Sequence, residues 1–339
     1  MEFSRFVAIG DSQTEGMCDE AGPDLYRGWA DRLAEQLSTV NPGLRYANLA
    51  IRGKNTRDTL VEQLEPALAL RPDLIAAPLG MNDVIGRADL DVVHADLDKI
   101  YGSLAESGAT VVISTFPDIA QINPLGRAFE PRLFEINDIM RGFSRRYGFV
   151  LVDLFAAPVL RDRRSWSTDR LHASSLGHDR FAAGAAHALG LPGSDPGWGR
   201  ALDFTGEPNP LRRTVDDARW LVEFFTPWIV RKVRGRSLGD GRTPKRPELT
   251  PIVAPGGRRG GLRIGPGDAG RREQGDGERR PFLSGHVRAA IVAAADTARR
   301  RSRSNCRSTP SAMSVTTSRE AITVRRSSLM IRRVPCASS

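Results

Sequence analysis

Over roughly its first 190 residues, the chain alternates short, continuously apolar runs with longer stretches in which apolar residues recur every three or four positions. A continuous apolar run of about four to eight residues is typical of a strand that is buried on both faces of a sheet. We predict five such strands, over residues 6–9, 45–50, 74–79, 110–115 and 149–154.

Helices are predicted between these strands, because the apolar positions of the longer stretches fall on one face of a helix. Val93, Leu97 and Leu104, for example, recur at helical spacing, and Gly108 follows them as a helix stop. The predicted helices cover residues 23–37, 56–70, 90–107, 133–147 and 174–189.

Strands that alternate with helices pair in parallel, because each helix returns the chain across a face of the sheet. Right-handed crossovers then favour an α/β fold of three layers, α/β/α, around a doubly wound, flavodoxin-like parallel sheet of five strands. Ligands of such sheets bind beyond the carboxyl ends of the strands. The candidate loops therefore begin at Gly10, Ala50, Leu79, Thr115 and Asp153.

The pattern changes after Leu191. Residues 192–210 are rich in Gly, Pro and Asp, which predicts a loop, and residues 216–233 predict one amphipathic, aromatic-rich helix that Pro227 should kink. Such a helix either packs on the main domain or makes a peripheral contact with a membrane, its aromatic residues inward and its basic residues at the headgroups. No run of 18 apolar residues occurs, so no membrane-spanning helix is expected.

Positive charge is concentrated at the end of the chain. The formal net charge is +9, but residues 252–339 hold 18 Arg, no Lys and 6 acidic residues, so they carry +12 and the first 251 residues carry −3. The excess therefore predicts no nucleic-acid partner for the rest of the chain. We predict an α/β domain over 1–190, an extension over 191–251, and an Arg/Gly/Ser-rich tail over 252–339 that is disordered or the product of a frameshift.

The cysteines Cys18, Cys306 and Cys336 are too few and too scattered for a disulfide framework or a CxxC zinc site. The first residues also lack the pattern of a secretory signal peptide. We therefore expect a cytoplasmic protein.

Candidate chemistry begins where the first strand ends, at Gly10, Asp11 and Ser12. A serine at this edge of the sheet is a candidate nucleophile, provided that a base lies within hydrogen-bond reach. The alternative is a helix N-cap, for which serine is a preferred residue.

Two further loops carry groups that suit an oxyanion. Asn82 follows the third strand, and its amide can donate hydrogen bonds without carrying a charge. Gly53 follows the second strand, where the absence of a side chain lets a backbone N–H approach a ligand. A turn or an Asx cap is the alternative role for Asn82.

Asp169 and His172 precede the last predicted helix. A carboxylate three residues before a histidine can fold onto its Nδ1 proton, which leaves Nε2 free to act as a base. The alternatives are a solvated surface histidine or a zinc site formed by Asp169, His172 and His178, although no thiol or HExxH helix supports a metal. His178 itself is expected to be structural.

These residues together resemble the SGNH or GDSL-type hydrolases, a family named for a Ser, a Gly, an Asn and a His in four sequence blocks. Ser12, Gly53, Asn82 and His172 match the four positions in order, and Asp169 takes the place of the acid that orients the histidine. The resemblance covers about residues 5–190. One departure is Gln13, where the family's nickname has Leu.

The resemblance implies the SGNH hydrolase fold and a serine hydrolase that cleaves carboxylic esters through an acyl-enzyme, as an acyl esterase, lipase-like enzyme or acetylesterase. Ser12 would be the nucleophile, His172 the base and Asp169 its orienting acid. The N–H groups of Ser12 and Gly53 and the side chain of Asn82 would form the oxyanion hole. No metal or organic cofactor is implied.

The sequence leaves the ester open among short acyl, lysophospholipid, thioester and acetylated-sugar substrates, and it does not indicate an oligomeric state. A second class of function is a non-catalytic, flavodoxin-like module that binds a small molecule such as a phosphate at the Ser12 loop. The chain has neither a GxGxxG nor a Walker motif to favour this alternative.

Overall fold

The computed structural model describes residues 2–22, 25–118, 120, 122–123, 125–203, 210–225 and 239–252. The chain divides into two units, 1–262 and 263–339, and all described residues lie in the first. The predicted tail over 252–339 lies outside the described residues, apart from Ile252.

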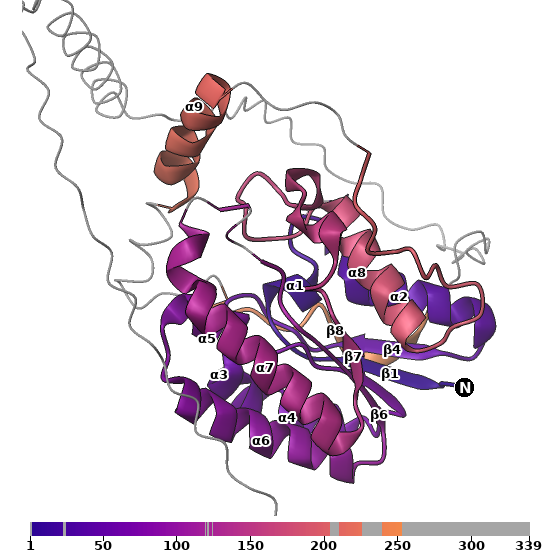
Figure 1. The fold of residues 1–339 in the computed structure, drawn as a ribbon. Coiled ribbons are helices and arrows are strands. Elements are labelled where there is room, and N and C mark those ends of the chain that lie inside the picture. The colour runs from indigo at the N-terminus through magenta and orange to yellow at the C-terminus, as the bar shows by residue number, and fades with distance from the viewer. Residues whose placement is uncertain are drawn as a thin grey trace, which may run out of the picture. The chain divides into compact units, whose positions relative to one another are not determined.

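A six-stranded sheet forms the centre of the first unit (Figure 1). Five of its strands are parallel, in the order β4-β1-β5-β6-β7. Numbered along the chain, this is the flavodoxin-like order 2-1-3-4-5, which confirms the predicted topology. The strands are β1 (Arg5–Ala8), β4 (Arg45–Asn48), β5 (Leu74–Ala76), β6 (Thr110–Ser114), β7 (Val150–Val152) and β8 (Arg246–Pro251).

Helices cover both faces of the sheet, as expected for three layers (Figure 1). Alternate residues of β1 enter two cores: Phe6 and Ala8 pack with α2 and α8, and Val7 packs on the opposite face with α4, α6 and α7. The helices are α1 (Ser12–Glu15), α2 (Gly28–Val40), α3 (Thr56–Glu62), α4 (Leu64–Ala69), α5 (Met81–Gly86), α6 (Leu90–Glu106), α7 (Glu130–Tyr147), α8 (Ser175–Ala188) and α9 (Pro210–Trp220).

Two predicted helices differ in the structure. The helix expected over 23–37 begins only at Gly28, after a short hairpin of β2 (Glu20–Gly22) and β3 (Leu25–Tyr26). The helix expected over 56–70 is divided at Gln63 into α3 and α4. The side-chain amide of Gln63 accepts the N–H of Gly10 at 2.8 Å and donates to its carbonyl at 2.9 Å. Gln63 thus supports the loop that leads to Ser12.

The extension contributes a strand that the sequence pattern did not predict, so the sheet has six strands rather than five. β8 pairs antiparallel with β4, and Tyr46 lies opposite Thr250. Its sequence contains two prolines and one leucine, which resembles a loop, but prolines are tolerated in a strand at the edge of a sheet.

The aromatic helix expected over 216–233 begins earlier, at Pro210, and continues after Trp220 as a π-helical turn over Leu221–Phe225. Residues 226–233 lie outside the described residues. Within the described part of the chain, no helix has the length and apolarity needed to cross a membrane.

Candidate active site

Ser12 is the first residue of α1, just beyond the carboxyl end of the central strand β1. Gly10 turns the chain there with a φ of 142°. The carboxylate of Asp11 then caps α1 by accepting the N–H of Gln13 at 3.0 Å. The N-cap is therefore Asp11, so the alternative role considered for Ser12 is wrong, and its hydroxyl is available for other contacts.

The loop before α8 holds the carboxylate of Asp169 in one orientation. Its Oδ1 accepts the N–H groups of Leu171 and His172, both at 3.0 Å, and the hydroxyl of Ser167. Its Oδ2 lies 2.6 Å from Nδ1 of His172. The three-residue spacing thus turns the carboxylate onto the imidazole ring, as the sequence analysis predicted.

The other nitrogen of the ring reaches the first helix, since His172 Nε2 lies 2.9 Å from the Oγ of Ser12. Gln13 joins the same two segments. Its amide donates to the carbonyl of Leu171 at 2.9 Å and accepts the N–H of Ala173 at 3.3 Å, so it binds the backbone on both sides of His172. The residue that departs from the family's nickname therefore supports the contact between Ser12 and His172.

Charge and burial act in opposite directions on this pair. Burial by itself lowers the pKa of His172, but the hydrogen bond and negative charge of Asp169, together with Cys18 beside the ring, outweigh it, so the pKa lies above its ordinary value. Burial raises the pKa of Asp169, but hydrogen bonds from His172 outweigh burial and hold it below its usual range. A neutral ring of raised basicity can accept the hydroxyl proton of the adjacent serine, which would make Ser12 a nucleophile.

Gly53 lies in an exposed turn, and its φ of 78° is the left-handed conformation that glycine adopts readily. An ion pair holds this turn beside α1. Glu15 accepts the backbone N–H of Arg52 at 2.7 Å, and its carboxylate also binds the Arg52 guanidinium. Glu15 and Ser12 share one helical turn, so this pair sets the position of Gly53 relative to Ser12.

The backbone N–H groups of Ser12 and Gly53 have no hydrogen-bond acceptor among the residues that the structure describes. Such groups at a helix N-terminus and a glycine turn are suited to bind an oxyanion.

Asn82 lies at the start of α5, after the left-handed Gly80. Its Nδ2 donates to the carbonyl of Lys54 at 2.8 Å and approaches Asp11 Oδ2 at 3.3 Å. The side chain is therefore beside the Gly53 turn, as an oxyanion donor requires, but in this structure its hydrogens have protein acceptors. The longer contact to Asp11 is the weaker of the two and the one that a ligand would replace.

Asp11 is itself unusual, because it is buried next to Ser12. Burial raises its pKa to about 6, although the N–H of Gln13 and the charge of His172 act in the opposite direction. The nearby carboxylates of Asp83 and Glu15 raise it further.

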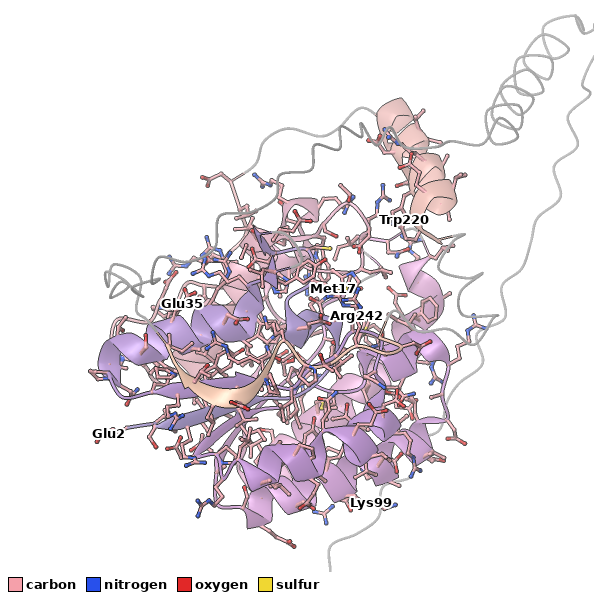
Figure 2. All side chains as sticks on the ribbon, turned by 180° about the vertical axis from the view of Figure 1, so that it is seen from behind. Glu2, Met17, Glu35, Lys99, Trp220 and Arg242 are labelled. Carbon is pink, nitrogen blue, oxygen red and sulfur yellow. The ribbon has the colours of Figure 1, made fainter. Side chains whose placement is uncertain are left out.

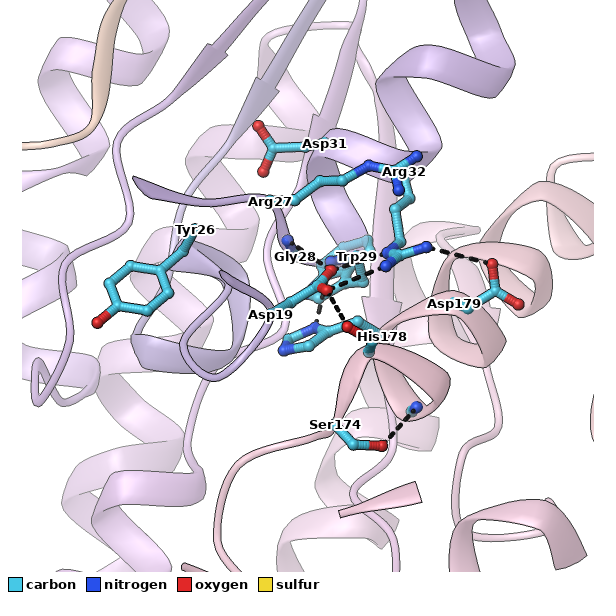
Figure 3. Close-up of polar contacts among 12 residues, drawn as sticks. Asp19, Tyr26, Arg27, Gly28, Trp29, Asp31, Arg32, Ser174, His178 and Asp179 are labelled. Atoms are coloured by element: carbon cyan, nitrogen blue, oxygen red, sulfur yellow. Dashed lines mark hydrogen bonds and ion pairs between the residues drawn. The ribbon is translucent and has the colours of Figure 1, made fainter. Parts of the chain in front are cut away.

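His178 does not join Asp169 and His172 in a metal site. Its Nδ1 accepts the N–H of Trp29 at 3.2 Å, and its Nε2 donates to the carbonyl of Met17 at 3.0 Å. Acceptance by Nδ1 requires a neutral ring, and burial lowers its pKa to about 4. Figure 3 shows His178 beside the network of Asp19 and Arg32 that joins the loop after α1 to α2. His178 is structural, as expected.

A thiol lies beside the histidine loop. The Sγ of Cys18 is 3.9 Å from Asp169 Oδ2, and ligand atoms of Cys18, Asp169 and His172 lie within 4.8 Å of one another. Thiolate, carboxylate and imidazole are ligands that zinc accepts, although the 2.6 Å contact between Asp169 and His172 already uses two of these atoms.

Four side chains at this site were not predicted from the sequence: Gln13, Glu15, Arg52 and Cys18. Arg52 immediately precedes Gly53, and Gln13 immediately follows Ser12, so proximity to the motifs is a signal that could have found them. No local pattern marks Cys18, which reaches Asp169 from 151 positions away.

A family profile and a curated relative both match this chain. The profile of the GDSL-like lipase/acylhydrolase family matches residues 8–180, just over half of the chain. An acetylxylan esterase from Geobacillus stearothermophilus is 26% identical over 219 residues, which cover 55% of this chain and 94% of the relative.

Two solved structures are among the matches to this chain. An alpha/beta hydrolase enzyme from the metagenome of Lake Arreo, Spain, is 25% identical with a TM-score of 0.46, covering 55% of this chain and 95% of that one. The acetylxylan esterase Axe2 from Geobacillus stearothermophilus is 22% identical with a TM-score of 0.47, covering 59% of this chain and 97% of that one.

The family match favours an enzyme over the non-catalytic binding module. It spans the segments that carry Ser12, Gly53, Asn82 and His172. The chain belongs to the GDSL-like lipase/acylhydrolase family and is a hydrolase that acts on ester bonds.

Proposed function

We propose that the protein cleaves carboxylic esters by a serine mechanism, with Ser12 as nucleophile, His172 as general base and Asp169 as the acid that orients it. The observation that carries this proposal is the continuous path from Ser12 Oγ to His172 Nε2 at 2.9 Å, and from Nδ1 to Asp169 Oδ2 at 2.6 Å. His172 removes the hydroxyl proton as Ser12 attacks the acyl carbonyl, and then protonates the departing alcohol. Water hydrolyses the acyl-enzyme in the second half of the reaction.

The tetrahedral oxyanion would be bound by the N–H groups of Ser12 and Gly53 and by the amide of Asn82. The first two are supported by the absence of other acceptors in the described part of the chain. For Asn82, the developing negative charge would replace Asp11 as the acceptor of one amide hydrogen, because that contact is long, at 3.3 Å.

We propose acetyl esters of carbohydrates as the substrates to test first, because the curated relative is named an acetylxylan esterase. Longer acyl esters and thioesters are the competing classes. Hydrolysis rates should therefore be compared across acetylated xylooligosaccharides, p-nitrophenyl acetate, p-nitrophenyl esters of longer acids and an acyl thioester.

The mechanism is tested by Ser12→Ala. The substitution should abolish both hydrolysis of p-nitrophenyl acetate and covalent labelling by a fluorophosphonate, because both require the serine hydroxyl. Ser103→Ala, on α6, is a matched control that should leave both unchanged. Labelling that persists in Ser12→Ala, at any residue located by mass spectrometry, would refute the assignment.

Two earlier predictions remain open. A cytoplasmic location is one. The other is a peripheral membrane contact through residues 216–233, for which flotation of the full chain with liposomes is the direct measurement.

A further inference from the structure

We propose that α9 clamps the loop that carries Asp169 and His172, and that Trp220 is a positioning residue for ester hydrolysis. The inference rests on the proposed roles of Asp169 and His172. It concerns a segment that lies beyond residue 180, where the match to the family ends.

The first contact is made by the indole of Trp220, which is only 3% exposed. Its Nε1–H donates to the backbone carbonyl of Asp169 at 2.7 Å. Figure 2 shows Trp220 where α9 approaches the body of the molecule. The carboxylate of Asp169 binds the His172 ring. Trp220 therefore restrains the backbone of Asp169, the residue whose side chain orients the imidazole.

The next residue of the loop is held by the same helix. Arg170, 6% exposed, forms an ion pair with Asp217, and its guanidinium carbon lies 5.6 Å from the centre of the Trp220 ring. Trp220 and Asp217 are one helical turn apart, so both side chains face the loop together.

The loop needs such support because of its backbone conformation. Arg170 has a φ of 56°, in the left-handed region that residues other than glycine rarely occupy. A residue in this region persists only where surrounding contacts hold it. Gln13 forms hydrogen bonds with the backbone of Leu171 and Ala173 in the same loop. Gln13 and α9 thus both restrain the loop that carries His172.

Loosening the clamp should therefore affect the chemistry more than substrate binding. If Asp169 is less firmly placed, its hydrogen bond to His172 weakens, and the ring loses both orientation and basicity. The expected signature is a lower kcat with little change in KM, together with a shift of the acid limb of kcat/KM towards lower pH.

The test uses the full chain with Trp220→Phe, which removes the N–H and keeps an aromatic ring, and with Asp217→Asn, which removes the ion pair. We expect kcat for p-nitrophenyl acetate to fall about three- to tenfold in each, the effect of one lost hydrogen bond, with KM within about twofold. Asp217→Glu, which keeps the charge, should restore most of kcat. Trp198→Phe changes a tryptophan that packs against Gly184 instead, and should keep the kcat and pH profile of the natural chain.

The inference is overturned if Trp220→Phe and Asp217→Asn keep the kcat and pH profile of the natural chain, or if they lower only the melting temperature. The rate of fluorophosphonate labelling separates this failure from failure of the proposed function. Slower labelling that still occurs at Ser12 supports the clamp, whereas labelling at another residue in the natural chain refutes the mechanism itself.

Discussion

Individual side chains hold this site together largely by binding backbone groups. Gln13 binds the chain on both sides of His172, and Gln63 binds both polar groups of Gly10. Glu15 binds the N–H of Arg52 beside the Gly53 turn. A contact with the backbone fixes a whole loop, so these residues control the geometry of Ser12, Gly53 and His172 without taking part in the chemistry.

Asp11 provides a test of how burial acts at one residue. Its pKa is raised from 3.8 to about 6 in the folded protein, so the folded state binds this proton more tightly than the unfolded state. Its contribution to the free energy of unfolding is therefore full below about pH 4 and is lost as the pH rises through about 6. Asp11→Asn, which keeps a cap acceptor, should raise the unfolding free energy at pH 7 by about 1–3 kcal/mol.

Urea unfolding of the natural chain and of Asp11→Asn at pH 7 and pH 4 measures this effect. The difference should disappear at pH 4, where the natural carboxyl is protonated in the folded state. An equal difference at both values would show that the charge of Asp11 is not its cause.

The motif residues could be selected as candidates from the sequence, because ligands of a doubly wound sheet bind beyond the carboxyl ends of its strands. Ser12, Gly53 and Asn82 follow the first three parallel strands, and Asp169 and His172 precede α8. Their supporting partners were not predictable in this way, because a glutamine or an arginine has no fixed role until its neighbours in space are known.

Among the elements, the buried strands and long amphipathic helices were predicted to within a few residues, since their apolar periodicity is set by the core they face. The failures have local causes. Gln63 divides one predicted helix, and β8 carries too few apolar residues to be recognised because it lies at the edge of the sheet.

The start of α2 was mispredicted for a packing reason that can be tested. A Cβ on Gly28 would lie 2.4 Å from the Cα of Gly16, and Gly28 has a φ of 72°. Gly28→Ala should therefore lower the unfolding free energy by about 2–4 kcal/mol, through the clash and the strained backbone together.

Gly142→Ala is the matched control, because a Cβ at Gly142 in α7 meets nothing within 4 Å. It should raise the unfolding free energy by about 0.5–1 kcal/mol, the advantage of alanine inside a helix. Thermal and urea unfolding measure both variants. A Gly28→Ala protein as stable as the natural chain would contradict the close packing of α1 against α2.

At the scale of the whole molecule, the distribution of charge and the path of the extension indicate which residues belong to the folded unit of the site. The excess positive charge lies in residues 252–339, and the sheet ends just before them with β8. Lys245, which precedes β8, forms a half-buried ion pair with Asp31 of α2 and donates to the carbonyls of Tyr26 and Arg27, at 3.0 Å each. The residues up to 252 thus belong to the same folded unit as the site.

Two truncations test this arrangement. A chain that ends at residue 252 keeps β8 and Lys245, so its melting temperature should lie within about 2 °C of the full chain, with ester hydrolysis retained. A chain that ends at residue 238 loses both and leaves the half-buried Asp31 without its partner, which should lower the melting temperature by roughly 10 °C. Equal melting temperatures for the two truncated chains would show that β8 and Lys245 contribute nothing.

Periodicity and motif order were enough to predict the three-layer fold and the order of the parallel strands, because these follow from short-range patterns. The same patterns, with a general rule about sheet edges, singled out Ser12, Asp169 and His172, whose side chains the structure brings into contact. Such patterns could not predict the contacts between segments that lie far apart in the chain. Three contacts join positions far apart in the chain: the hydrogen bonds of Gln13 to the His172 loop, the pairing of β8 with β4, and the hydrogen bond of Trp220 to Asp169. Their partners are selected by packing in three dimensions, which no local run of residues records.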